Sequence, residues 1–127
     1  MNVLLVEDED TVAEVVMEAM KSWGQKVVWV TSKKEAAAKI AESYFDMVLL
    51  DIMLPDGYGY EIIPDIKRAR PDVNIITMTG YNTLEMERTV RSYGITYYLS
   101  KPVNLDEFKT IVDHIEGKRV KEAETHG

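Results

Sequence analysis

The chain has 127 residues, the size of one ordinary domain, and a formal net charge of −7 at pH 7. It contains no cysteine, which excludes disulfides, thiol nucleophiles and zinc–thiolate sites, and its acidity argues against direct nucleic-acid binding. The N-terminus has neither a basic segment nor an apolar run long enough for a signal peptide or a membrane span, so we expect a cytoplasmic protein with no membrane partner.

The first half of the chain predicts two strand–helix units. An apolar run over residues 3–6 is followed by apolar side chains on one helical face over residues 12–23, where Thr11 and Glu14 have the spacing of a capping box. A second unit repeats this pattern over residues 27–44. The strand runs are continuously apolar rather than alternating, which indicates strands that are covered on both faces.

A third apolar run, residues 47–50, ends on a single carboxylate, Asp51. The stretch reads DMVLLDIMLPDGYGYE, so a loop with one proline and two glycines follows that carboxylate directly. Residues 60–70 have helical composition but include Pro64. We therefore expect this helix either to start late, near Ile63, or to be kinked.

The rest of the chain predicts two further units. A fourth run over residues 75–78 precedes residues 82–93, whose helical pattern has a thin apolar stripe. A helix anchored so poorly is a candidate for movement. A weaker fifth strand over residues 97–99 precedes a last helix that Asn104 can cap.

The alternation of strands and helices predicts an α/β fold, a doubly wound parallel (βα)5 sheet with right-handed crossovers. In such sheets, ligands bind outside the carboxyl ends of the strands. We expect one domain over residues 1–117. Residues 118–127 have the composition of a polar tail or the start of a linker.

Polar side chains follow the strands at this edge of the predicted sheet. Glu7 and Asp8 follow the first strand and Asp51 the third, Thr79 closes the fourth, and Lys101 follows the fifth. Neighbouring carboxylates repel, and a hard cation such as Mg²⁺, with Mn²⁺ as an alternative, compensates them. A carboxylate can itself be a nucleophile, so this edge predicts a phosphoryl-transfer site.

These motifs resemble those of response-regulator receiver domains of two-component signalling. The resemblance covers about residues 2–116 and rests on VLLVEDED, MVLLDIMLPDGYGYE, IITMTG and YYLSKP, in the right order. Each motif alone is weak, but the four together at this spacing are specific. The resemblance implies a flavodoxin-like fold with strand order 2-1-3-4-5, and a signalling domain that catalyses its own phosphorylation and dephosphorylation but is spent as a substrate rather than an enzyme.

By this resemblance, Asp51 accepts a phosphoryl group from the phosphohistidine of a sensor histidine kinase or a phosphotransfer protein. Asp8 and Asp51 would bind Mg²⁺ through their side chains, Met53 through its carbonyl and Glu7 through water. The peptide between Lys101 and Pro102 would be cis, as is common in the family.

The resemblance also implies a switch. Thr79 and Lys101 would sense the phosphoryl group, and Tyr98 would turn inward when the threonine moves. The surface of the fourth helix, fifth strand and fifth helix would then change partners, among them a second copy of the chain or an output domain C-terminal to it in a longer chain. The residues that would flank the phosphoryl group are Met53, Gly80 and Tyr81.

Simpler interpretations of the same residues stay open. Asp51 could cap the turn that follows it, and Glu7 and Asp8 could cap the first helix. Taken alone, Thr79 could be an ordinary strand-end hydroxyl and Lys101 a solvated surface lysine. Tyr98, likewise, could be a core aromatic residue.

Other functions also stay open. The main alternative is a pseudo-receiver that is never phosphorylated and acts as a docking module. A haloacid-dehalogenase-like phosphatase would need a second aspartate where Met53 stands. A flavodoxin would need a Ser/Thr/Gly-rich phosphate loop where this chain has EDED.

Overall fold

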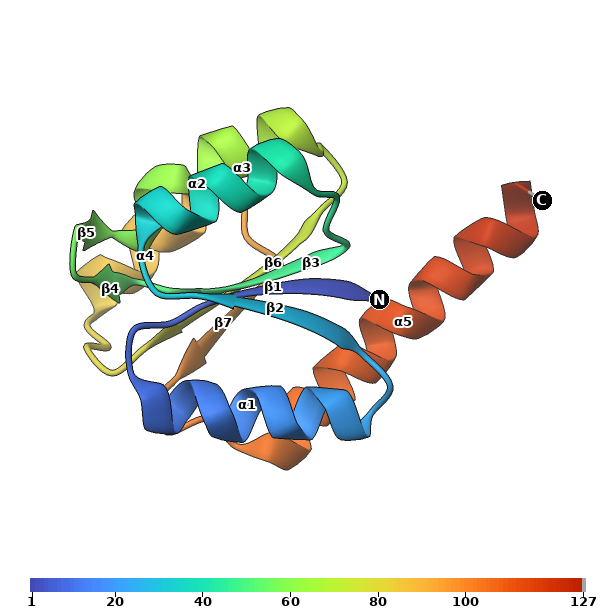
Figure 1. Ribbon diagram of the computed structural model, residues 1–127, viewed down its shortest axis with the longest axis horizontal. Coiled ribbons are helices and arrows are strands. Elements are labelled where there is room, and N and C mark those ends of the chain that lie inside the picture. Colours follow the sequence, from blue (N-terminus) through green and yellow to red (C-terminus); the bar gives the residue numbers. More distant parts are fainter. Residues whose placement is uncertain (127) are drawn as a thin grey trace.

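Five parallel strands form the centre of the structure (Figure 1). The computed structural model describes the backbone of residues 1–126 and the side chains of residues 1–121. The strands are β1 (Asn2–Val6), β2 (Lys26–Val30), β3 (Met47–Asp51), β6 (Asn74–Thr79) and β7 (Tyr97–Ser100). Their order across the sheet is β2-β1-β3-β6-β7. This confirms the predicted order 2-1-3-4-5, because β4 and β5 form a separate hairpin.

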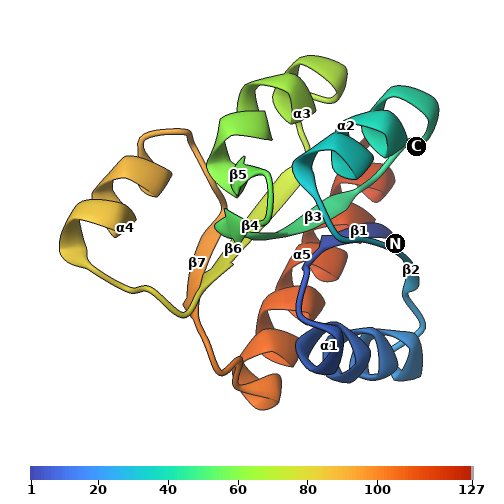
Figure 2. The same ribbon diagram turned by 60° about the vertical axis from the view of Figure 1, so that its left-hand side comes forward.

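Helices cover both faces of the sheet, as the continuously apolar strands predicted. Figure 1 places α2 (Lys33–Glu42) and α3 (Ile63–Ala69) on one face, and α1 (Asp10–Ser22) and α5 (Leu105–His126) on the other. α4 (Leu84–Arg91) lies toward the β7 edge (Figure 2). Because successive strand residues point to opposite faces, they enter two cores: Val3, Leu5, Leu49 and Met78 on the side of α1 and α5, and Leu4, Val6, Val48 and Ile75 on the side of α2 and α3.

The first helix begins two residues earlier than the sequence predicted. α1 starts at Asp10 with Glu9 as its N-cap residue, so the expected capping box of Thr11 and Glu14 is wrong. The Glu9 side chain makes no capping hydrogen bond. Shorter side chains such as Ser, Thr, Asp and Asn are the usual caps, because their oxygen reaches the first free N–H groups. The Glu9 carboxylate is therefore directed elsewhere.

The connection from β3 to α3 contains the predicted helix start. α3 begins at Ile63 with Pro64 in its first turn, which confirms the late start. Proline is tolerated there because the first N–H groups of a helix have no intrahelical partner. A hairpin of β4 (Met53–Leu54) and β5 (Gly57–Tyr58) and a 3₁₀ turn over Gly59–Ile62 precede α3.

The last helix runs past the predicted domain boundary. α5 continues through residues 118–126, where the sequence predicted a polar tail or linker, and Figure 1 shows its end projecting away from the sheet. Arg119 on this extension pairs with Asp46 at 3.5 Å. The role of the extension as the start of a linker stays a proposal. In the part of the chain that the structure describes, none of the helices has the length and apolarity to cross a membrane.

Candidate functional site

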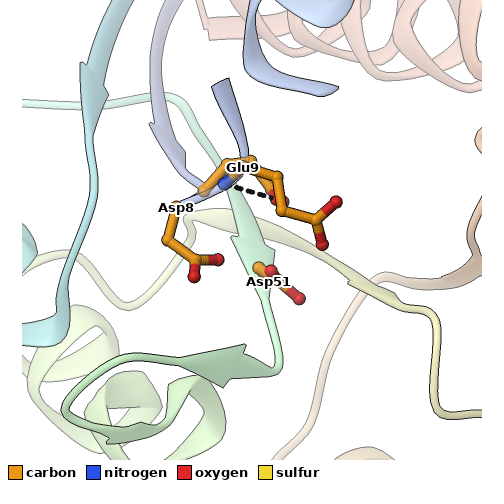
Figure 3. Close-up of side chains that lie close together, drawn as sticks. Asp8, Glu9 and Asp51 are labelled. Atoms are coloured by element: carbon orange, nitrogen blue, oxygen red, sulfur yellow. Dashed lines mark hydrogen bonds between the residues drawn. The ribbon is translucent and has the colours of Figure 1, made fainter. Parts of the chain in front are cut away.

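Four carboxylates converge at the carboxyl edge of the sheet. Asp51 is the last residue of β3 and Glu7 follows β1 directly, and both are buried. Asp8 and Glu9 come next in the loop before α1 and are exposed. One carboxylate oxygen of each of the four lies within 4.8 Å of the others. Figure 3 shows Asp8 and Glu9 above the strand end that carries Asp51.

Lys101 binds three of these carboxylates. Its Nζ lies 2.9 Å from Glu7 Oε1, 3.0 Å from Asp51 Oδ2 and 3.2 Å from Glu9 Oε1. The backbone places it there, because the Lys101 N–H donates to the Thr79 carbonyl at 2.8 Å, which ties the end of β7 to the end of β6. The Lys101–Pro102 peptide is cis, as the resemblance implied. The structure thus brings the predicted lysine to the predicted acids.

The charges in this pocket shift one another. Burial raises the pKa of Glu7 to about 7, with a further increase from Asp51, although the hydrogen bond from Lys101 opposes it. Burial likewise raises the pKa of Asp51 against the lowering effect of Lys101. Burial alone would lower the pKa of Lys101, but its hydrogen bonds to Glu7 and Asp51 raise it above the ordinary value, so the ammonium stays charged. The ammonium of Lys101 is therefore a single positive charge that faces several carboxylates.

The donor set fits a hard divalent cation. Glu7 Oε2 is buried and has no hydrogen-bond partner among the described residues. A buried carboxylate oxygen without a partner is costly, and a metal or a metal-bound water would satisfy it. The other available atoms are carboxylate and backbone oxygens, which are the ligands that Mg²⁺ prefers.

The loop after Asp51 packs tightly under the pocket. The Met53 N–H faces Asp51 Oδ1 at 3.4 Å, and the Met53 side chain is 49% exposed. The Gly59 N–H donates to the Ile52 carbonyl at 2.6 Å. A Cβ at Gly59 would overlap the backbone carbonyl of Asp51, so this position requires glycine. Gly59 thus lets the loop pass close to the backbone of Asp51.

The predicted phosphoryl sensor Thr79 is held by its own loop. Its hydroxyl is buried, accepts from the Tyr81 N–H at 2.9 Å and lies 3.2 Å from the Tyr81 carbonyl. The Tyr81 side chain is 58% exposed, and Gly80 approaches the Lys101 side chain. In this form the Thr79 hydroxyl is thus engaged with backbone at the rim rather than with Asp51.

Tyr98 lies at the β7 edge beside α4. Its side chain is half-buried, and its hydroxyl donates to Asn82 Oδ1 at 3.0 Å. The Arg91 guanidinium lies over the ring, 5.6 Å from its centre. Tyr97, the preceding residue of the strand, points to the other face and packs against the core on the side of α1 and α5. Tyr98 is therefore an edge aromatic residue in this form.

Glu9 is the member of the pocket that the sequence reasoning missed. The signal was present, because the run EDED places four acids in a row after β1. The end of the predicted strand, however, placed only the first two of these acids, Glu7 and Asp8, at the site. Which of the remaining side chains turns toward Lys101 depends on how the loop enters α1.

Comparisons with known proteins agree with this geometry. Residues 3–113 match the model of the response regulator receiver domain. The chain is 30% identical over 111 residues to the DNA-binding transcriptional regulator NtrC of Azospirillum brasilense, which covers 87% of this chain and 23% of that protein. A receiver domain protein (CheY-like) from Methanospirillum hungatei has a TM-score of 0.85 at 28% identity, covering 94% and 97% of the two chains. The beryllofluoride-activated NtrC4 receiver domain dimer has a TM-score of 0.84 at 28% identity, covering 90% and 94%.

The fold and the site define a CheY-like α/β signalling domain. The chain belongs to the response regulator receiver domain family of two-component signal transduction. It spans about a quarter to a half of the length of the curated relatives it matches.

Proposed function

We propose that this domain is a phosphorylation-dependent switch. Asp51 accepts a phosphoryl group, in a Mg²⁺-dependent reaction, from the phosphohistidine of a sensor histidine kinase or a phosphotransfer protein. The observation that carries the proposal is the binding of Lys101 to both Glu7 and Asp51, two buried acids at adjacent strand ends. A buried nucleophile beside a fixed cation is what transfer of an anionic group requires.

The chemistry needs no proton at the acceptor. A carboxylate oxygen of Asp51 attacks phosphorus, the phosphorus–nitrogen bond of the phosphohistidine breaks, and its electron pair returns to the imidazole. The ammonium of Lys101 stays charged and opposes the negative charge that the phosphoryl group brings. Because the phosphoryl group stays on Asp51, the domain is consumed as the acceptor substrate rather than regenerated as an enzyme.

Mg²⁺ would be held by the side chains of Asp8 and Asp51 and the carbonyl of Met53, with Glu7 acting through a water. When bound, the cation would neutralise charge on the transferred phosphoryl group. Mn²⁺ is chemically close enough to take the same ligands. The partnerless oxygen of Glu7 supports this assignment.

The switch would run from the pocket to the surface of α4, β7 and α5. The Thr79 hydroxyl would leave the Tyr81 backbone for a phosphoryl oxygen, and Tyr98 would leave Asn82 and turn inward. The exposed side chains of Met53 and Tyr81, together with Gly80, would flank the phosphoryl group and set how easily water reaches it. Each step replaces a contact that the resting form holds.

The changed surface would bind other proteins in the cytoplasm. An output domain in a longer chain is one partner, since the matched relatives extend well beyond the length of this chain. A second copy is another, since NtrC4 supplies a related receiver that is a dimer when activated by beryllofluoride. Gel filtration with and without beryllofluoride and Mg²⁺ tests the dimer, and an unchanged elution volume would contradict it.

The acceptor is tested by intact mass after incubation with acetyl phosphate. We expect the wild-type domain to gain one phosphoryl group when Mg²⁺ is present and none with EDTA. Asp51→Asn should gain none. Asp56→Asn is the matched control, because Asp56 lies five residues away and accepts hydrogen bonds from the backbone of α2 instead of facing the pocket.

The pseudo-receiver alternative makes the opposite forecast. A domain that binds Mg²⁺ but gains no phosphoryl group from acetyl phosphate or from a phosphohistidine donor would favour docking without phosphorylation. Equal gains in wild type and Asp51→Asn would place the acceptor elsewhere.

A further inference from the structure

Glu9 lies in the pocket but has no part in the roles given above. Its Oε1 is 3.2 Å from Lys101 Nζ, and 58% of its side chain is exposed. Its backbone N–H donates to Glu7 Oε1 at 3.2 Å, and its side chain makes no capping bond to α1. The side chain therefore contacts the pocket and leaves the N-terminus of α1 without a side-chain cap, a role that shorter polar residues usually fill.

Lys101 thus has three anionic partners in the resting domain. Glu7 and Asp51 hold it from the buried side, and Glu9 reaches it from the solvent side. The pocket is still short of positive charge, because Glu7 Oε2 is buried without a partner among the described residues. A further negative charge at Glu9 favours the arrival of a cation and opposes the arrival of an anion.

We propose that Glu9 is a positioning residue for Lys101, an inference that rests on the function proposed above. Glu9 holds the ammonium in the resting domain and competes for it with a phosphoryl group on Asp51. Two effects of opposite sign follow. The Glu9 charge strengthens Mg²⁺ binding to the resting pocket, and it weakens the phosphorylated form, which must take Lys101 away from it.

Three variants separate the contact from the charge. Glu9→Gln keeps the size of the side chain and removes its charge. Asp10→Asn removes the same charge one residue later, from an exposed position in the first turn of α1. Glu9→Asp keeps the charge but is one methylene shorter, so it loses reach to Lys101 and can cap the helix instead.

Two binding constants give the test. Mg²⁺ titration follows the tryptophan fluorescence, to which Trp29 contributes from beside the site, because its indole N–H donates to the Glu7 carbonyl at 2.8 Å. Beryllofluoride titration at saturating Mg²⁺ measures affinity for a phosphoryl mimic. We expect Glu9→Gln to weaken Mg²⁺ binding and to tighten beryllofluoride binding, each about two- to fivefold, the range of a partly exposed ion pair. Asp10→Asn should change both by less, and Glu9→Asp should tighten beryllofluoride binding while leaving Mg²⁺ affinity near wild type.

A shift of both constants in the same direction in Glu9→Gln would overturn the inference, because loss of local structure affects both alike. Equal effects of Glu9→Gln and Asp10→Asn would also overturn it, since the lost contact would then be irrelevant.

Nitrogen NMR of the Lys101 ammonium, assigned with Lys101→Arg, tests the contact without any phosphoryl mimic. We expect hydrogen exchange of the ammonium to speed up about two- to fivefold in Glu9→Gln and Glu9→Asp but not in Asp10→Asn. Unchanged exchange in all three would show that Glu9 does not hold Lys101. A wild-type domain that binds Mg²⁺ but no beryllofluoride would overturn the proposed function, and the ammonium measurement would still decide the role of Glu9.

Discussion

Glu7 couples the stability of the domain to pH. Its pKa in the folded chain is raised from an ordinary 4.5 to about 7, chiefly by burial. The folded state therefore holds this proton more tightly than the unfolded state does. Proton binding to Glu7 therefore stabilises the folded state. This contribution to stability is full below about pH 4.5 and is lost as the pH rises through about 7. Asp51 has a raised pKa for the same reason and acts in the same direction.

Replacing Glu7 by its neutral isostere should reduce this pH dependence. We expect the urea midpoint of the wild-type domain in EDTA to fall as the pH rises from about 4.5 to about 7, and Glu7→Gln to fall less, because only the Asp51 contribution remains. Glu14→Gln, an exposed position on α1, is the control and should follow the wild type. If Glu7→Gln kept the full slope, the assignment of the raised pKa to Glu7 would be wrong.

At the scale of residues, the sequence predicted which groups share the site but not how they pair. Glu7, Asp51 and Lys101 could be placed because each follows a strand, and parallel strands end at one edge. The contact of Glu9 with Lys101 joins residues 92 positions apart and depends on the exact start of α1. No local pattern encodes it, and the expected capping box at Thr11 pointed to a different start.

At the scale of elements, α4 is weakly attached to the rest of the domain. Within α4, all of whose residues are described, Val90 alone is buried, and Leu84 is 64% exposed. This confirms the thin apolar stripe in the sequence. Beyond the helix, Tyr93 packs on Tyr60 with 5.2 Å between ring centres, and Tyr60 stacks on Tyr58 at the same distance. The end of α4 is thus joined to the loop that follows Asp51.

Removing the central ring of this stack should loosen α4. We expect Tyr60→Leu to speed amide hydrogen exchange in α4 about two- to tenfold, because an aromatic pair contributes about 0.5–1.5 kcal/mol beyond its buried area. Exchange in the central strands should not change. Tyr44→Leu removes a tyrosine from the other end of the molecule, where it stacks under Arg70, and should leave α4 exchange unaltered. Equal protection of α4 in Tyr60→Leu and wild type would refute the anchoring role.

Among the elements, the strands were predictable because strand burial leaves a strong apolar signal, whereas their order was implied by the family resemblance. The hairpin of β4 and β5 was not predictable, since two-residue strands carry no period. α5 continues past Gly117 although Gly117 and the polar segment after it resemble a helix end. A single glycine costs a helix only about 1 kcal/mol, and the lysine, glutamate and alanine that follow are strong helix formers.

At the scale of the whole molecule, the apolar cores and the functional site occupy different parts of the sheet. Two cores, one on each face, hold the strands, and the site uses only side chains at their carboxyl edge. At the opposite edge, Asp46 accepts from Arg70 at 2.9 Å and pairs with Arg119, which ties the α5 extension to the sheet. In the proposed switch, a charge change at the carboxyl edge acts on α4 and β7 while the two cores keep the strands together.

In the proposed function, Asp51 is the phosphoacceptor. The most direct measurement is borohydride reduction of the domain after incubation with acetyl phosphate and Mg²⁺, followed by tandem mass spectrometry of its peptides. Reduction converts an aspartyl phosphate into homoserine and marks the modified position permanently. We expect homoserine at position 51 alone, and none when Mg²⁺ is removed. Homoserine at position 8, or a phosphoryl group gained without any homoserine, would contradict it.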